Sequence, residues 1–112
     1  MPAYLIAHRR EISDPETLKK YNHVESTVEK FGGKVVLRSD SFEVLEGKWN
    51  SGRHMDDSRP ERLTIIEFPD MGKLRGWYDS DDYASLKSIR QHASASDVIA
   101  ADGDFIAGAQ RP

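Results

Sequence analysis

The sequence predicts an α+β fold with the element order βαββαβ, in which helices cover one face of an antiparallel sheet. Short apolar runs bounded by turn residues indicate strands, and apolar residues repeated every three or four positions indicate helices. The two kinds of segment alternate, so that each half of the chain runs strand, helix, strand. With 112 residues the chain has the length of one domain, which we assign to residues 1–103, followed by a C-terminal tail at 104–112.

Residues 3–9 form the first expected strand, in which Leu5 and Ala7 face the side opposite to Tyr4, Ile6 and His8. A helix should follow, because Asp14 suits the N-cap and Pro15 the first helical position. The helix should continue to residue 31, because apolar residues recur at helical spacing: Leu18, Tyr21, Val24, Val28 and Phe31. Gly32 then suits the left-handed conformation that ends helices.

The middle of the chain predicts two strands, at 34–38 and 42–47, joined by a turn. The polar stretch 48–62 is predicted to be a long surface loop, because Gly52 and Pro60 interrupt helices and strands. The run LTIIEF at 63–68 is the clearest strand of the sequence.

The second helical region begins after Pro69-Asp70 and restarts at Ser80, which suits a second N-cap followed by two aspartates. Its apolar stripes are Met71, Leu74, Trp77 and Tyr78, then Tyr83, Leu86, Ile89 and Ala93. The run DVIAA at 97–101 is the last expected strand.

Composition excludes several classes of protein. The chain has 16 Lys and Arg against 19 Asp and Glu, a net charge of -3, which argues against a nucleic-acid partner. It has no cysteine, which excludes disulfides and thiolate metal sites. No apolar run approaches the roughly 20 residues of a membrane helix, and the start MPAYLIAHRR lacks the features of a signal peptide. We therefore expect a cytoplasmic protein without a membrane partner.

The strands YLIA, KVVL, LTII and VIAA carry apolar residues on both faces. One layer of helices covers only one of these faces, and a face open to water should alternate with polar residues. The simplest cover is a second copy of the same sheet, which predicts a homodimer. The alternative is that the long loop folds back over the open face.

The chain resembles the bacterial family called domain of unknown function 1330 (DUF1330) over nearly its whole length up to Gly103. The residues that carry the resemblance are Gly32-Gly33, Arg38, the run 42–47 with Trp49, the run 63–69, Trp77-Tyr78-Asp79-Ser80, Tyr83, Leu86 and Arg90. The resemblance implies a ferredoxin-like protomer of the dimeric α/β-barrel superfamily, in which two sheets pack face to face. The loop 50–61 and the tail 105–112 are longer than the family pattern.

Glu67 is a candidate general base, because it alternates with Leu63 and Ile65 and so shares a face with apolar residues. His8 is a second candidate for proton transfer. The alternative for Glu67 is a structural ion pair with an arginine of a neighbouring strand.

Arg38 and Arg90 are candidates for binding the carboxylate of a small ligand, since guanidinium groups make bidentate contacts with carboxylates. The alternative for each is a salt bridge or a surface arginine whose apolar stem packs on the protein. The aromatic residues Trp49, Trp77, Tyr78 and Tyr83 are candidates for the wall of a ligand pocket, or simply for the core.

Two functions remain open from the sequence. Relatives implied by the resemblance include cofactor-free monooxygenases and isomerases of ring compounds, in which Glu67 or His8 would move a proton. The alternative is a dimer, non-catalytic or stress-associated, that binds a small-molecule ligand. Neither requires a cofactor, and no histidine pair has metal-ligand spacing, so we expect no metal; haem binding would need an axial histidine such as His8.

Overall fold

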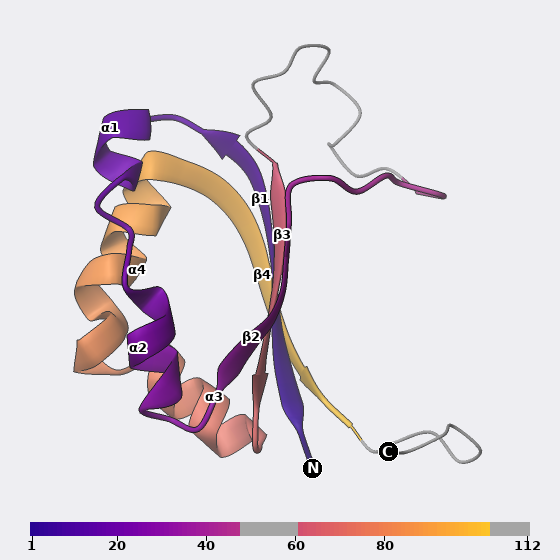
Figure 1. The fold of residues 1–112 in the computed structure, drawn as a ribbon, viewed down its shortest axis with the longest axis vertical. Helices are drawn as coiled ribbons and strands as arrows, with labels where there is room; N and C mark the ends of the chain where they lie inside the picture. Colours follow the sequence, from indigo (N-terminus) through magenta and orange to yellow (C-terminus); the bar gives the residue numbers. More distant parts are fainter. Residues whose placement is uncertain (48–60, 104–112) are drawn as a thin grey trace.

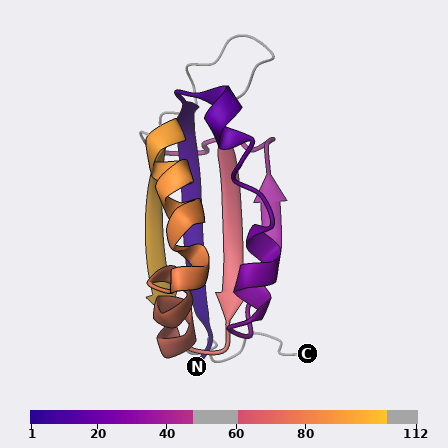
Figure 2. The same ribbon diagram turned by 90° about the vertical axis from the view of Figure 1, so that its left-hand side faces the viewer.

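The computed structural model describes residues 1–47 and 61–103. Its strands are β1 (Ala3–Ile12), β2 (Lys34–Ser39), β3 (Arg62–Phe68) and β4 (Ser94–Asp102). Its helices are α1 (Pro15–Leu18), α2 (Val24–Glu29), α3 (Met71–Tyr78) and α4 (Asp81–Ala93). The strands form one antiparallel sheet in the order β2-β3-β1-β4, and the helices lie on one face of it (Figures 1 and 2). This confirms the predicted α+β, ferredoxin-like arrangement.

The two faces of the sheet follow from strand alternation and register. Leu5 pairs with Ile66 and Ala7 with Thr64 on the face under the helices. The intervening residues, with Ile6 opposite Ile65, therefore point to the other face. We call these the helical face and the open face.

The core lies between the helical face and the helices. Its buried members are Ala3, Leu5, Val24, Val28, Ile66, Phe68, Leu74, Trp77 and Tyr83. Of its three large aromatic residues, Trp77 and Tyr83 come from the α3–α4 region and Phe68 comes from β3. The α3–α4 region thus anchors the helical layer on the sheet.

The predicted helix ends are confirmed where local hydrogen bonds determine them. The side chains of Asp14, Asp70 and Ser80 each accept a hydrogen bond from a backbone amide of the following helix. Gly32 has a φ of 79°, the left-handed conformation expected after a helix.

The prediction of a single helix over residues 15–31 is wrong. The structure has two short helices, separated at residues 19–23. The side chain of Asn22 donates to the carbonyl of Lys19, and His23 adopts the left-handed conformation with a φ of 59°. These local bonds compete with the helical ladder and redirect the chain.

The strand expected at 42–47 is also absent: this segment is irregular in the structure. β3 already occupies the inner edge of β2, and the segment leaves the sheet on the side away from the helices (Figure 1). Phe42 packs edge-on against the ring of His8, and Leu45 is 86% exposed.

Some predictions lie outside the described residues: those on Trp49, on the loop 50–60 and on the tail 104–112. Glu61, expected at the end of the loop, is 2% exposed and lies beside His8. Within the described part of the chain, no helix has the length and apolar character needed to cross a bilayer.

Candidate functional site

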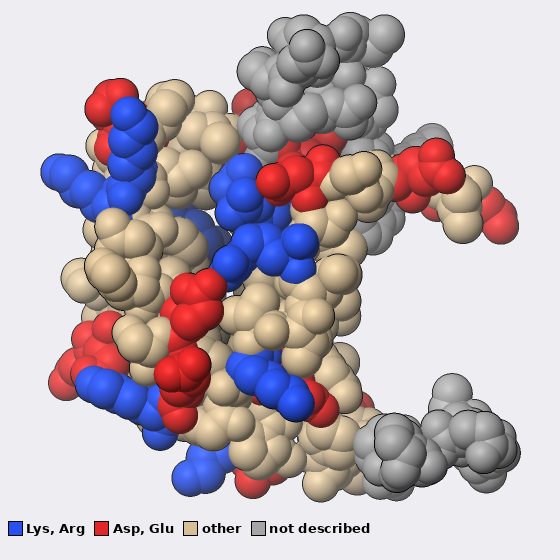
Figure 3. All heavy atoms as spheres, viewed as in Figure 1, with Lys and Arg blue, Asp and Glu red and all other residues tan. Residues whose placement is uncertain are grey.

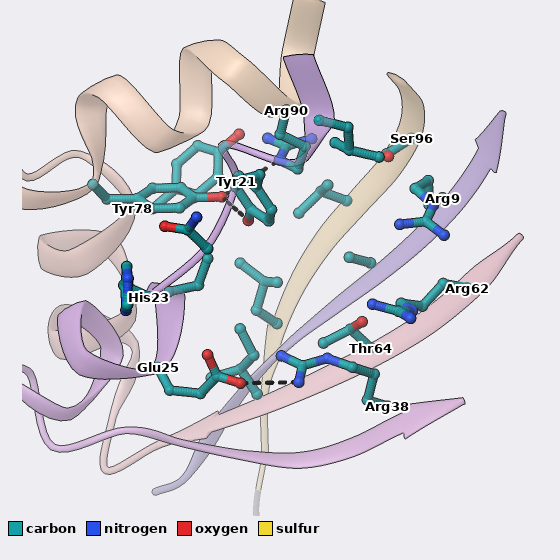
Figure 4. A pocket seen from close by; sticks show the side chains of 18 of the residues that line it. Arg9, Tyr21, His23, Glu25, Arg38, Arg62, Thr64, Tyr78, Arg90 and Ser96 are labelled. Carbon is teal, nitrogen blue, oxygen red and sulfur yellow. Dashed lines mark hydrogen bonds and ion pairs between the residues drawn. The ribbon is translucent and has the colours of Figure 1, made fainter. Parts of the chain in front are cut away.

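A cavity of about 470 Å³ lies between the helical face of the sheet and the helices. Its sheet side is built by Leu5 and Ala7 of β1, Ile66 of β3 and Val98 of β4. These side chains share one face because each strand alternates and the strands are in register. In Figure 4, polar side chains lie at two ends of the cavity. Tyr21, Tyr78 and Arg90 are at one end, and Arg9, Arg62 and Arg38 are at the other.

The helical end of the cavity is aromatic. The rings of Trp77 and Tyr83 stack with their centroids 4.1 Å apart, and the Trp77 indole N–H donates to Thr27 Oγ1 over 2.9 Å. The cap residue Ser80 joins α3 to α4, because its hydroxyl donates to the Trp77 carbonyl and accepts from the Tyr83 amide. The local turn thus holds both rings in place.

A chain of polar groups crosses this end of the cavity. The hydroxyls of Tyr21 and Tyr83 lie 2.7 Å apart, and Arg90 Nε donates to the Tyr83 hydroxyl over 3.4 Å. Burial, followed by the neighbouring Tyr83, raises the pKa of Tyr21. Tyr21 therefore remains a protonated hydroxyl that can donate a hydrogen bond.

The strand end of the cavity is lined by arginines. Arg62 makes two hydrogen bonds to the carboxylate of Asp40, at 2.7 and 3.1 Å, and Arg38 lies 2.9 Å from Glu25 Oε2. The hydrogen bonds from Arg62 hold the pKa of Asp40 below its usual value. Hydrogen bonds from its own backbone amide and from Arg38 do the same for the pKa of Glu25. Both carboxylates are therefore ionised at neutral pH and orient the guanidinium groups.

The predicted site residues divide between the two faces of the sheet. Five of them line the cavity: Arg38, Trp77, Tyr78, Tyr83 and Arg90. Trp77 and Tyr83 also belong to the core, and Arg38 also forms a salt bridge with Glu25. The structural alternatives therefore hold for these residues, and their ligand-binding role stays a prediction.

Glu67 and His8 lie on the open face, across the sheet from the cavity. Glu67 accepts from the Tyr4 hydroxyl over 3.0 Å and lies 3.7 Å from Lys34 Nζ. His8 Nε2 lies 3.4 Å from the carboxylate of the buried Glu61. The structure does not bring these two residues to the arginines and aromatics, and their catalytic role stays a prediction.

Arg9, Arg62 and Tyr21 are among the polar residues of the cavity that sequence reasoning missed. Arg9 has the same parity as Leu5 and Ala7, so alternation along β1 was a usable signal. No comparable signal existed for Tyr21, because it was assigned to a continuous helix.

A metal site is not evident in the described ranges 1–47 and 61–103, where no three His, Asp or Glu side chains gather. The cavity instead offers hydrogen-bond donors, aromatic rings and positive charge. It can hold a small organic molecule and orient it by its polar groups.

The fold and the cavity define a ferredoxin-like α+β protein with a pocket between sheet and helices. The chain belongs to the family domain of unknown function (DUF1330), whose model matches residues 2–104. No curated protein matches it.

Solved structures with the same fold include a protein of unknown function from Rhodopseudomonas palustris. That protein is 19% identical, with a TM-score of 0.67 over 94% of this chain and 84% of the other. SnoaB, a cofactor-independent oxygenase from Streptomyces nogalater, is 9% identical, with a TM-score of 0.61 over 96% and 97%. A dimeric protein of ferredoxin-like fold from Bacteroides fragilis is 10% identical, with a TM-score of 0.50 over 91% and 96%. These similarities establish the fold.

Proposed function

We propose that this protein binds a small organic ligand in the cavity between the sheet and the helices. The observation that carries the proposal is the convergence of an apolar sheet surface, an aromatic end and several arginines on one space of about 470 Å³. This volume lies in the range of small-molecule sites, which combine a mostly apolar lining with a few polar groups that set orientation.

The test is a thermal-shift screen of aromatic and alicyclic compounds against the wild type and two matched variants. Ala7→Leu inserts a larger side chain into the cavity, whereas Ala84→Leu makes the same change on the exposed surface of α4. We expect compounds that raise the melting temperature of the wild type and of Ala84→Leu, but not of Ala7→Leu. Compounds that stabilise all three proteins equally would contradict binding in this cavity.

Catalysis on the bound ligand, of the cofactor-free monooxygenase or isomerase kind, is the second candidate function. It is favoured by the hydrogen-bonded set Tyr21, Tyr83 and Arg90, which could polarise an oxygen of the ligand. It is also suggested by the shared fold with a cofactor-independent oxygenase. Incubating each confirmed ligand with the protein in air and analysing products by mass spectrometry separates catalysis from binding alone.

We also propose that the protein works as a homodimer through the open face. Leu37, Ile65, Ile6 and Ile99 form one row in cross-strand register, one residue from each strand. Ile99 is 58% and Leu37 42% exposed, and a row of this kind marks an interaction surface. The exposed Leu45 lies on a segment that projects to the same side (Figure 1).

A further inference from the structure

The charge of the cavity lining is strongly one-sided. Among the described lining residues, five are basic (Arg9, Lys19, Arg38, Arg62 and Arg90) and one, Glu25, is acidic. The whole chain, by contrast, is slightly acidic, with a net charge of -3. In the space-filling view, Lys and Arg gather in the hollow between the helical layer and the sheet (Figure 3). A cleft lined by one sign of charge concentrates ligands of the opposite sign.

Three of these guanidinium groups come from neighbouring strands. Arg9 of β1 is the direct register partner of Arg62 of β3, and Arg38 of β2 pairs with Thr64, two residues further along β3. All three side chains lie at the same end of the cavity, opposite Tyr21 and Arg90 (Figure 4). The bonds of Arg62 to Asp40 and of Arg38 to Glu25 hold two of them in a defined orientation.

Two like charges directly opposite each other in a sheet destabilise it. Here the pKa of Arg9 is lowered, first by burial and then by the nearby Arg62, whereas the nearby Asp40 opposes this shift. Asp40, bound to Arg62, offsets part of this repulsion, and a ligand anion between the two guanidinium groups would offset more of it. A group in a cavity whose pKa is shifted by burial and by a neighbouring charge is a candidate for a functional site.

We propose that the ligand of this cavity is a small organic acid whose carboxylate is bound by Arg9 and Arg62. Its apolar body lies against Ala7, Ile66 and Val98 and points towards the tyrosines. This inference rests on the proposed ligand-binding function and adds to it the chemical class of the ligand. Paired guanidinium groups suit a carboxylate because each can donate two parallel hydrogen bonds.

The test compares acids with their neutral amides. The probes are 1-naphthoate with 1-naphthamide and 4-hydroxyphenylacetate with its amide, titrated by calorimetry. We expect an acid to bind about tenfold or more tightly than its amide, as charge-assisted hydrogen bonds imply, and its affinity to fall with added salt. Arg9→Gln should remove this preference by weakening the binding of the acid much more than that of its amide.

Arg75→Gln is the matched control, because Arg75 lies on α3 outside the cavity and is paired with Asp79. Arg62→Gln is a second test variant, and melting curves establish that each variant is folded. If acid and amide bind equally, or if Arg9→Gln behaves like Arg75→Gln, the acid assignment is wrong while ligand binding stands. If neither acids nor amides bind, both the proposed function and this inference fail.

Discussion

Individual side chains determine the chemical character of the cavity. Arg38 and Arg90 were expected to serve a ligand, and the structure adds Arg9 and Arg62 at one end and Tyr21 at the other. Arg38 and Arg62 bind carboxylates, and Arg90 donates to the hydroxyl of Tyr83. The site therefore depends on a few side chains that alternation and local turns aim at the same space.

Gly33, just before β2, is closely packed by core side chains. A Cβ atom at this position would lie 2.6 Å from Phe68 Cε1 and 2.8 Å from Val28 Cγ1, and both neighbours are buried. We expect Gly33→Ala to lower the free energy of unfolding by about 1 to 3 kcal/mol, as overpacking of a core does. Urea denaturation measures this change.

Gly103→Ala is the control for that measurement, because a Cβ atom at Gly103 would meet nothing within 4 Å. It should unfold at the same urea concentration as the wild type. Equal stability of the two variants would show that the core around Gly33 accommodates a methyl group.

Helix boundaries determine how the aromatic side chains reach the cavity. The break between α1 and α2 frees Tyr21 from the helical stripe, and its hydroxyl then contacts Tyr83, 62 positions away. At the junction between α3 and α4, the hydroxyl of Ser80 bonds to the backbone of both Trp77 and Tyr83 and so holds the two residues next to each other. Short helices with defined ends thus shape this side of the cavity.

Ser80→Ala removes both hydrogen bonds of this junction. We expect a loss of about 1 kcal/mol in the free energy of unfolding, the usual effect of deleting an N-cap side chain. Ser85→Ala, on the exposed surface of α4, is the matched control and should leave stability unchanged or slightly raised, since alanine is the better helix former. Chemical denaturation followed by circular dichroism compares them; similar losses in both would argue against a capping role for Ser80.

The molecule as a whole presents two chemically different faces of one sheet. The helical face holds the core and the cavity, whereas the open face carries the apolar row of Leu37, Ile65, Ile6 and Ile99. Covering this row with a second sheet would separate the dimer contact from the ligand site. Each protomer would then keep its own cavity.

Ile65→Lys tests this arrangement, because burying an unpaired ammonium group in an apolar interface is strongly unfavourable. By light scattering after gel filtration, we expect the wild type to have the mass of two chains and Ile65→Lys the mass of one. Ser85→Lys adds the same charge on the exposed helical surface and should remain dimeric. A wild type with the mass of one chain, or a dimeric Ile65→Lys, would contradict pairing through this face.

Features that depend on neighbouring residues could be predicted from the sequence. The four strands, the caps at Asp14, Asp70 and Ser80 and the left-handed Gly32 all follow from alternation and from hydrogen bonds within a few positions. Strand alternation also predicted that both faces of the sheet would carry apolar residues. This local information was enough to establish the fold class.

Contacts between distant segments were beyond such reasoning. Arg9 faces Arg62 only because β1 and β3 pair in one particular register, and Tyr21 meets Tyr83 only after the helix breaks. The segment 42–47 has strand-like composition but is irregular: the chain leaves the sheet after β2, and Phe42 packs against the ring of His8 on β1. Local periodicity predicts the face of the element on which a side chain lies. Strand register and packing determine which residues it contacts, and the cavity is formed by contacts of this second kind.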